Sequence, residues 1–360
     1  MILKKYHNYI FRVYCKNFLS VCLIFTCIGF IINLFEEIKF FEKYEADIFY
    51  PIYLSLLNVP SLLFEIFPFI FLLTTKFFFI NLNDKHEFDI LNTNGVSNFK
   101  ILSSISFLVT IISIILIIFF YSFSSKFKTF YLDIKNSFSN NNEYLAVVND
   151  DGLWIKEEID GNLNIIHAEK IEKNLLKKVT ISRSEKGTNS NQTYVAETAN
   201  ITKKKWILNE VKILNNEGNK DLKDTSTYQS TFNGEIISRL FSNLNSLNLY
   251  QLHELSENYN KIGYSTTEVK IHLNKVYSSP VFFILMTILG FLIMFKFSFI
   301  NSKFLTITVG IFVSVTIYYL NYFSSLLGSN EILPIYISVW TPHLILFLTC
   351  SIGLIKINEK

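Results

Sequence analysis

Long apolar runs that are almost free of charge lie in two groups of three, on either side of a polar middle. They cover residues 18–35, 50–82, 101–123, 281–299, 305–327 and 333–355. About 20 apolar residues are needed for an α-helix to cross the hydrocarbon core of a bilayer. The pattern therefore predicts six transmembrane helices with an insert between the third and the fourth.

The first two runs need separate interpretation. Residues 36–39, Glu-Glu-Ile-Lys, offer no small-x-small cleavage site after the first run, which is therefore predicted to be an uncleaved helix rather than a secretory signal. The second run is too long for one straight span. We expect Pro60 and Pro68 to divide it into an interfacial approach and a span that starts near Leu62.

The polar middle shows the alternation of apolar and polar residues that is typical of β-strands. The candidate strands are Tyr144–Val148, Gly152–Lys156, Leu163–His167, Lys178–Ser182, Thr193–Glu197, Lys205–Asn209 and Glu210–Leu214. Strands at this spacing favour a β-sandwich or jelly roll. The apolar content is modest for a closed core, so a lipid or a partner protein is expected to fill one face or edge.

The expected organisation therefore has three parts. Residues 1–123 hold the first three transmembrane helices, 124–275 hold an all-β jelly-roll-like domain with a helical connector at its end, and 276–360 hold the last three helices. This is a helical membrane protein with an inserted all-β domain.

Composition supports this class and excludes others. The chain is 50% hydrophobic and only 18% charged, and its net charge of +3 is too small to indicate nucleic-acid binding. None of the four cysteines, Cys15, Cys22, Cys27 and Cys350, lies in the polar middle. Their spacing indicates neither a disulfide framework nor a metal site.

The distribution of Lys and Arg in the short loops predicts the orientation. One side carries Lys4, Lys5, Arg12, Lys16, Lys76, Lys85, Lys100, Lys296, Lys303, Lys356 and Lys360. The other side carries only Lys39 and Lys43. We therefore expect both termini in the cytoplasm and the insert on the far side of the membrane, which is the periplasm if the cell is Gram-negative.

A short polar helix is predicted between the second and third runs, near residues 84–95. Phe88 and Leu91 fall on one face of it, and Glu87 lies near its start, where the helix dipole favours a carboxylate. Asn94 and Gly95 supply the stop. A helix this short, between two spans, is expected to need a second protein on which to pack.

The segment from His86 to Gly95 resembles the coupling helix of the LptF/LptG (YjgP/YjgQ) family of lipopolysaccharide export permeases. A second resemblance covers the return to the membrane, where the family carries a Leu-x-x-Leu helix, a Gly, a Lys and a Pro. These residues are matched here by Leu249, Leu252, Gly263, Lys275 and Pro280. The strand at 152–156, Gly-Leu-Trp-Ile-Lys, and the Phe67-Pro68 pair are closer to LptG than to LptF.

The resemblance implies a permease rather than an enzyme, with no catalytic residue, cofactor or metal of its own. The chain has no nucleotide-binding loop, so ATP is expected to be hydrolysed by a separate cytoplasmic ABC ATPase dimer. Glu87, Phe88, Leu91 and Gly95 would couple to it. The other implied partners are an LptF-like permease, periplasmic jelly-roll proteins of the LptC/LptA type, and lipopolysaccharide itself. From spacing alone, Glu87 could equally be a carboxylate that only caps its helix.

Four residues are expected at the substrate site: Asn33, Lys39, Lys43 and Lys275. The lysines would bind phosphate on the lipid head group as point charges. Lys39 and Lys43 could equally be ordinary interfacial lysines, because acidic residues surround them. The family commonly has a Lys at the end of the first span, where this chain has Asn33.

Two ionisable residues leave rival functions open. Glu65 and His343 lie in or beside apolar runs, where such groups are costly and indicate function by default. Glu65 near a span end could also reach water, and His343 could be a packing residue. The rival functions are an intramembrane lipid-modifying enzyme and an FtsX/MacB-like mechanotransmitter or membrane anchor.

Overall fold

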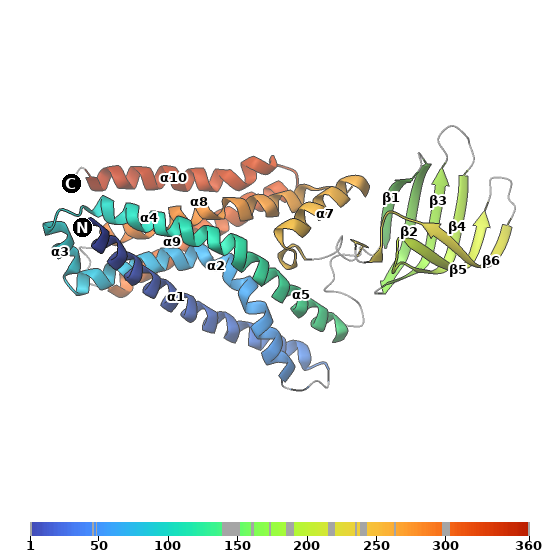
Figure 1. Cartoon of the computed structure of the whole chain (residues 1–360), viewed down its shortest axis with the longest axis horizontal. Coiled ribbons are helices and arrows are strands. Elements are labelled where there is room, and N and C mark those ends of the chain that lie inside the picture. Colours follow the sequence, from blue (N-terminus) through green and yellow to red (C-terminus); the bar gives the residue numbers. More distant parts are fainter. Residues whose placement is uncertain are drawn as a thin grey trace. The chain divides into compact units, whose positions relative to one another are not determined.

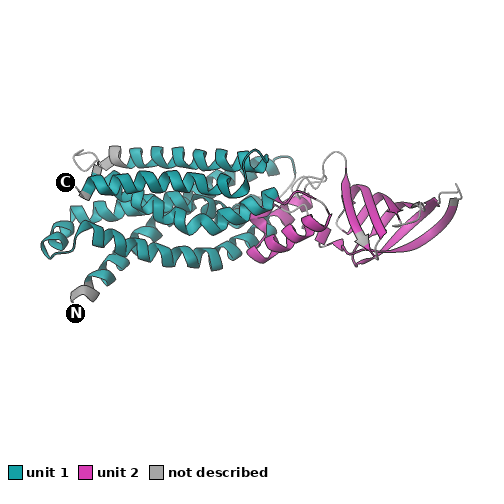
Figure 2. Ribbon diagram, turned by 90° about the horizontal axis from the view of Figure 1, so that it is seen from above, with its two compact units in different colours: residues 1–131, 267–360 teal, residues 132–266 magenta. Residues whose placement is uncertain are grey.

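The chain folds into two compact units, one helical and one mainly β (Figure 2). The helical unit holds residues 1–131 and 267–360, and the insert unit holds 132–266. The computed structural model describes residues 2–44, 47, 49–138, 152–159, 162–172, 174–184, 191–214, 220–234, 236–237, 243–262, 264–296 and 303–358. The expected limits of the insert were 124 and 275. The helices at both junctions run past those positions.

Six helical segments of the described residues are long and apolar enough to cross a membrane, as predicted. They are α1 (Ile2–Phe41), α2 (Phe49–Asp84), α4 (Asn98–Ile115) continued by η1 and α5, α8 (Thr267–Lys296), α9 (Lys303–Ser329) and α10 (Ile335–Asn358). The short helix α3 (Glu87–Thr93) joins α2 to α4. The start of α1, α3 and the end of α10 lie at one end of the unit (Figure 1).

The prediction for the second run is wrong in one respect. Pro60 and Pro68 do not divide it, because α2 is one helix from Phe49 to Asp84. Each proline removes one backbone donor, but packing of α2 on its neighbours outweighs that loss. Lys76, expected in a loop, is fully buried inside α2. Gly310 of α9 makes room for it, since a Cβ at Gly310 would lie 2.6 Å from Lys76 Nζ.

The third span is interrupted in its middle. A π-helical turn, η1 (Leu116–Phe120), separates α4 from α5 (Tyr121–Phe138). A π-helical turn inserts an extra residue into an α-helix and rotates the following side chains around the axis. As a result Tyr121 is directed into the bundle, where its hydroxyl lies 2.9 Å from His272 Nε2 of α8.

The spans differ in how far the unit buries them. In the most apolar 18-residue window of α8, 61% of the residues are buried, against 11% for both α1 and α9. α8 and α2 therefore form the centre of the apolar core, where Phe71 stacks on Phe283 with ring centroids 4.9 Å apart. Helices α1 and α9 each expose many large apolar residues, Leu19 and Phe312 among them.

The insert is one antiparallel sheet of six strands in sequential order (Figure 1). The strands are β1 (Leu153–Ile159), β2 (Asn162–Glu172), β3 (Leu175–Ser184), β4 (Asn191–Asn200), β5 (Lys205–Leu214) and β6 (Lys220–Gln229). The prediction of an all-β insert is confirmed. The described strands pair only with their neighbours in sequence, which is meander connectivity in one sheet rather than the two packed sheets of a sandwich.

Two strand predictions need correction. The segments Lys205–Asn209 and Glu210–Leu214 form the single strand β5, and β6 was not predicted. In β5 the side-chain alternation shifts by one residue at Glu210, whose φ of 53° marks a bulge. Lys178 of β3 has a similar φ of 50°. The candidate strand Tyr144–Val148 lies outside the described residues.

The sheet curls until its two edge strands meet through side chains. Glu157 of β1 is buried and accepts hydrogen bonds from the Tyr228 hydroxyl of β6 at 2.7 Å and from Ser230 Oγ at 3.0 Å. The backbone N–H and the hydroxyl of Thr231 also donate to it, at 3.0 and 2.8 Å. Trp206 is buried inside the curl and donates to the Phe232 carbonyl at 2.8 Å. One face of the sheet is thus the core of the insert.

The connector after the sheet is helical, as predicted. A 3₁₀ turn, η2 (Leu244–Ser246), precedes α7 (Leu249–Ile262), and α8 then begins at Thr267 and continues through Pro280. Within the insert, α7 and β1 are in contact, and the Tyr264 hydroxyl donates a hydrogen bond to the Trp154 carbonyl of β1. Gly263 lies outside the described residues.

Candidate functional site

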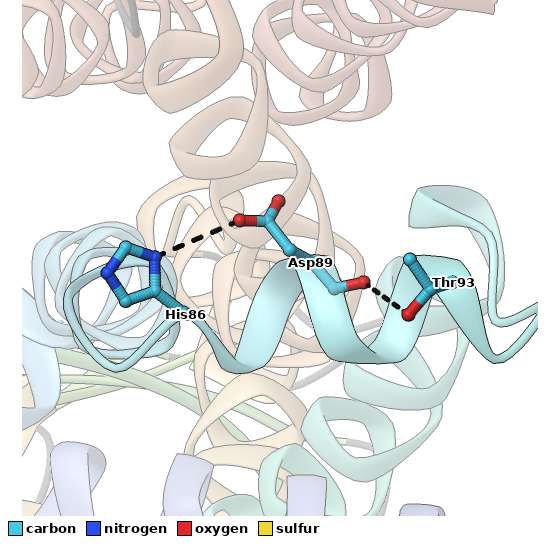
Figure 3. A network of polar contacts seen from close by, with 3 residues as sticks. All are labelled: His86, Asp89 and Thr93. Carbon is cyan, nitrogen blue, oxygen red and sulfur yellow. Dashed lines mark hydrogen bonds and ion pairs between the residues drawn. The ribbon is translucent and has the colours of Figure 1, made fainter.

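The short helix α3 begins and ends at left-handed residues. His86 before it has φ 55° and Gly95 after it has φ 80°. The Val96 N–H bonds to the Leu91 carbonyl and the Gly95 N–H to the Asn92 carbonyl, both at 3.0 Å, which is a Schellman stop. His86 lies 4.0 Å from the Asp89 carboxylate, and Thr93 Oγ1 donates to the Asp89 carbonyl at 3.0 Å (Figure 3). The predicted stop at Gly95 is thus present.

One face of α3 packs on its own chain. Phe88 contacts Phe295 of α8 and Phe79 of α2, with ring centroids 5.6 and 6.3 Å apart, and Leu91 also packs on the core. The expectation that α3 needs a second protein for packing is therefore wrong. The opposite face is exposed and includes Asp89 and Ile90, the latter 57% exposed. Phe99, in the first turn of α4, is 66% exposed.

Glu87 lies between these two faces and is half-buried. The Tyr9 hydroxyl of α1 donates a hydrogen bond to Glu87 Oε2 at 2.5 Å. Glu87 is also the first residue of α3, where the helix dipole favours its charge. The carboxylate therefore lies in the first turn of α3 and also contacts the first span.

Further polar contacts fix the first half of α1 in the bundle. His7 Nδ1 lies 2.9 Å from Ser104 Oγ of α4, and the Tyr14 hydroxyl lies 3.2 Å from Thr75 Oγ1 of α2. Asn81 of α2 donates to Asn17 Oδ1 at 2.6 Å. These contacts hold the α3 end of α1 against the rest of the helical unit.

A buried polar cluster lies near the opposite end of α1. Asn58 of α2 donates to Asn33 Oδ1 at 2.8 Å, and Lys128 of α5 donates to Asn58 Oδ1 at 2.7 Å. Asn33 is 1% exposed and Asn58 5%. Asn33, which was predicted at the substrate site, therefore faces its neighbouring helices. Asn58 links it to the Lys128 cation of α5.

A buried carboxylate lies one turn further along α1. Glu37 is fully buried, and its Oε1 accepts a hydrogen bond from the Tyr131 hydroxyl at 2.7 Å. Lys128 Nζ also lies 4.5 Å from the centre of the Tyr131 ring, a cation–π distance. We call Asn33, Glu37, Asn58, Lys128 and Tyr131 the outer polar cluster. Four of its members, all except Asn33, were not predicted from the sequence, because the contacts join residues 25 to 94 positions apart.

The three lysines predicted at the substrate site are exposed. None of them belongs to the outer polar cluster defined above. Lys39 lies in the last turn of α1, and Lys43 lies in the turn that follows. Lys275 is on α8, within electrostatic range of Glu65 on α2. The structure therefore separates Asn33 from the lysines with which it was grouped.

Glu65 and His343, the two residues that left an intramembrane enzyme open as an alternative, have different surroundings. Glu65 is exposed on α2. His343 of α10 is 4% exposed and packs between Phe282 and Trp340, with ring centroids 4.9 and 5.9 Å away. His343 is thus an aromatic packing residue. Among the described residues, no group of three or more His, Cys, Asp or Glu side chains is arranged to hold a metal ion.

Six apolar spans, a short polar helix at one end of the bundle and an antiparallel β insert between the third and fourth spans have the architecture of a multi-pass membrane protein. The sequence matches the family described as "Lipopolysaccharide export system permease LptF/LptG" over residues 8–356. The chain belongs to this family. A search of curated proteins found no match.

Proposed function

We propose that the chain is the permease subunit of an ABC transporter that extracts lipopolysaccharide from the outer leaflet of the bacterial inner membrane. It pairs with an LptF-like permease and a cytoplasmic ATPase dimer, and both termini lie in the cytoplasm. The observation that carries this proposal is the family match across the spans, α3 and the insert. Within the family we place the chain nearer LptG, because of the strand at 152–156 and Phe67-Pro68.

In this proposal α3 is the coupling helix. Phe88 and Leu91 anchor it on α2 and α8, and Gly95 ends it. Its exposed face, with Asp89 and Ile90, then contacts the ATPase subunit, and Glu87 at the border of the two faces transmits the contact. The anchoring matters because a loosely held helix would absorb the movement of the ATPase instead of passing it to the spans.

The gate for the lipid forms from α1 and α9. Their low burial supports this assignment, since each exposes long apolar faces that need acyl chains or another span as neighbours. Lys39, Lys43 and Lys275 are exposed and bind head-group phosphates in this scheme, with Asn33 and Lys128 behind them. The charge that the family commonly places in α1 thus comes from α5.

The insert receives the lipid and passes it to a periplasmic bridge of LptC/LptA-type domains. Its edge strands are β1 and β6, and such edges can extend by strand addition into the next domain.

The test is purification in mild detergent with ATPase content as the readout. Wild type is compared with Glu87→Ala and Glu87→Lys, and Glu257→Ala is the control because Glu257 is an exposed glutamate of α7, outside the surface proposed to contact the ATPase. We expect wild type and the control to carry an ATPase and a second six-span protein. Glu87→Lys should lose the ATPase, and Glu87→Ala should lose it or uncouple it.

Two outcomes contradict the proposal. If wild type purifies with no ATPase in any detergent, the transporter assignment fails. If Glu87→Lys retains a fully coupled ATPase, α3 is not the coupling element, although the family membership stands.

A further inference from the structure

The hydrogen bond between Tyr9 and Glu87 joins two elements that are 78 positions apart in the sequence. Tyr9 is 37% exposed, at the start of the first span. Its hydroxyl is the donor, and the carboxylate that accepts is the coupling residue of the proposed function. The contacts of His7, Tyr14 and Asn17 reach α4 and α2, whereas that of Tyr9 reaches α3 itself.

We infer that Tyr9 is a positioning residue for Glu87, and that its hydroxyl ties the coupling helix directly to the first span. This inference rests on the proposed function and adds a route to it. A movement of α3 passes to α1 through the Tyr9–Glu87 bond, in addition to the route through α2 and α8.

The geometry supports this role in two ways. First, α3 has only seven residues, and its apolar anchors Phe88 and Leu91 fix just one of its faces. The bond from Tyr9 fixes Glu87, which lies at the edge of that face, and so limits the rotation of α3 about its own axis. Second, a hydrogen bond to an ionised acceptor is stronger than one between neutral groups. It can therefore persist at a half-buried position such as that of Glu87.

Connection to α1 has a specific value for a gate. Helix α1 is continuous from Ile2 to Phe41, without proline, and it carries Asn33 and Glu37 of the outer polar cluster at its far end. A displacement of Tyr9 is therefore passed along one rigid element to that cluster. Helix α2, the other neighbour of α3, lies in the packed centre of the unit and moves less freely.

The test is Tyr9→Phe in the full complex, reconstituted with lipopolysaccharide and an acceptor jelly-roll protein. The change removes the hydroxyl and keeps the ring, and Tyr6→Phe, one turn earlier in α1, is the matched control. We expect Tyr9→Phe to assemble with the ATPase and to keep the KM for ATP. Lipid released per ATP hydrolysed should fall about three- to tenfold, the range for losing one typical hydrogen bond, because partial exposure to water reduces the gain from the charge of the acceptor.

A double-variant cycle separates positioning from a general loss of structure. Glu87→Gln alone should lower lipid released per ATP, and Tyr9→Phe should lower it by a smaller factor in that variant than in wild type, because glutamine offers the hydroxyl only a weaker, neutral acceptor. A merely structural role of the Tyr9 hydroxyl would instead multiply the two effects and lower the yield of complex.

Each result decides the matter. A Tyr9→Phe complex that couples as well as Tyr6→Phe overturns the inference and leaves the proposed function intact, because assembly with the ATPase is measured separately. Multiplicative effects in the double variant also overturn it. A wild-type protein without any ATPase overturns both.

Discussion

Glu37 in the helical unit and Glu157 in the insert are both buried carboxylates that accept a 2.7 Å hydrogen bond from a tyrosine distant in sequence. They differ in what surrounds that bond. Both oxygens of Glu157 are occupied by neutral donors from the end of β6 and the two residues after it. The tyrosine of Glu37 is instead shared with a half-exposed cation, Lys128.

The difference shows that a buried carboxylate bonded to a tyrosine can have two structural roles. A buried carboxylate is costly unless donors compensate for its lost hydration. In the insert the donors come from one short segment, so the carboxylate fixes the closure of the sheet and nothing more. In the helical unit the donor to Glu37 comes from α5, and Lys128 of the same helix also donates to Asn58, which in turn holds Asn33 of α1. A change of charge at Lys128 is therefore expected to change how α1 is held.

The largest effect is expected from removing the acceptor in the insert. Glu157→Ala leaves the half-buried Tyr228 hydroxyl and the buried Ser230 hydroxyl without their acceptor, and each such loss costs about 1–3 kcal/mol. We expect the free energy of unfolding of the insert to fall by about 3–5 kcal/mol. Pulse proteolysis of the detergent-solubilised protein across a urea series measures it.

Glu169→Ala is the control for that experiment, because Glu169 is an exposed glutamate of the same sheet, paired with Lys178 at 2.8 Å. It should change the urea midpoint little, since exposed ion pairs contribute little. Equal effects of the two substitutions would mean that Glu157 does not close the sheet.

A smaller effect is expected in the helical unit. Tyr131→Phe removes the donor to Glu37 while keeping the ring under Lys128, and we expect a loss of about 1–3 kcal/mol. Thermal unfolding of the full protein in detergent measures it. Tyr336→Phe serves as the control, because Tyr336 is 70% exposed on α10. A melting temperature that stays at the control value would show that Glu37 is compensated without Tyr131.

The smallest effect is a dependence of the stability of the insert on alkaline pH. Burial, and then the Glu157 carboxylate, raise the pKa of Tyr228 above its usual value. The folded insert thus favours the protonated phenol. This stability is complete below the pKa of an unfolded tyrosine, about 10, and is lost as the pH rises beyond it.

Urea midpoints of the insert between about pH 8 and 11 test this dependence. Wild type should lose stability more steeply than Tyr228→Phe above about pH 10, because the variant has no phenol to ionise. Parallel curves for the two proteins would show that Tyr228 ionises as freely in the folded insert as in the unfolded chain.

The sequence was sufficient for the features that repeat along the chain. Uninterrupted apolar runs predicted the six spans, and Asn94-Gly95 predicted the stop of α3. Strand β6 could not be found in this way, because Lys220–Gln229 contains only Leu222 and Tyr228 as large apolar residues. It forms because β5 offers a free edge. The bulge at Glu210 hid the continuity of β5 by shifting its alternation.

The candidate sites show the same limit: residues in a local sequence pattern could be predicted, whereas contacts between residues distant in sequence could not. Glu87 and Gly95 were predicted from a local helix pattern and the resemblance, and the structure places both at the ends of α3. The donor to Glu87 was not predicted, because Tyr9 lies in another helix. Asn33 was predicted at the substrate site, but its burial depends on Asn58 and Lys128, which only the packing of three helices brings together.

The length of α1 has a mechanical consequence. Its 40 residues correspond to a rod of about 60 Å, roughly twice the thickness of a hydrocarbon core of about 30 Å. A rod of that length that turns by about 10° around its middle moves its two ends by about 5 Å in opposite directions. If the end of α1 at Tyr9 moves toward the bundle, the end that carries Asn33 and Glu37 would therefore move away from it, because the helix tilts about its middle, within the bilayer.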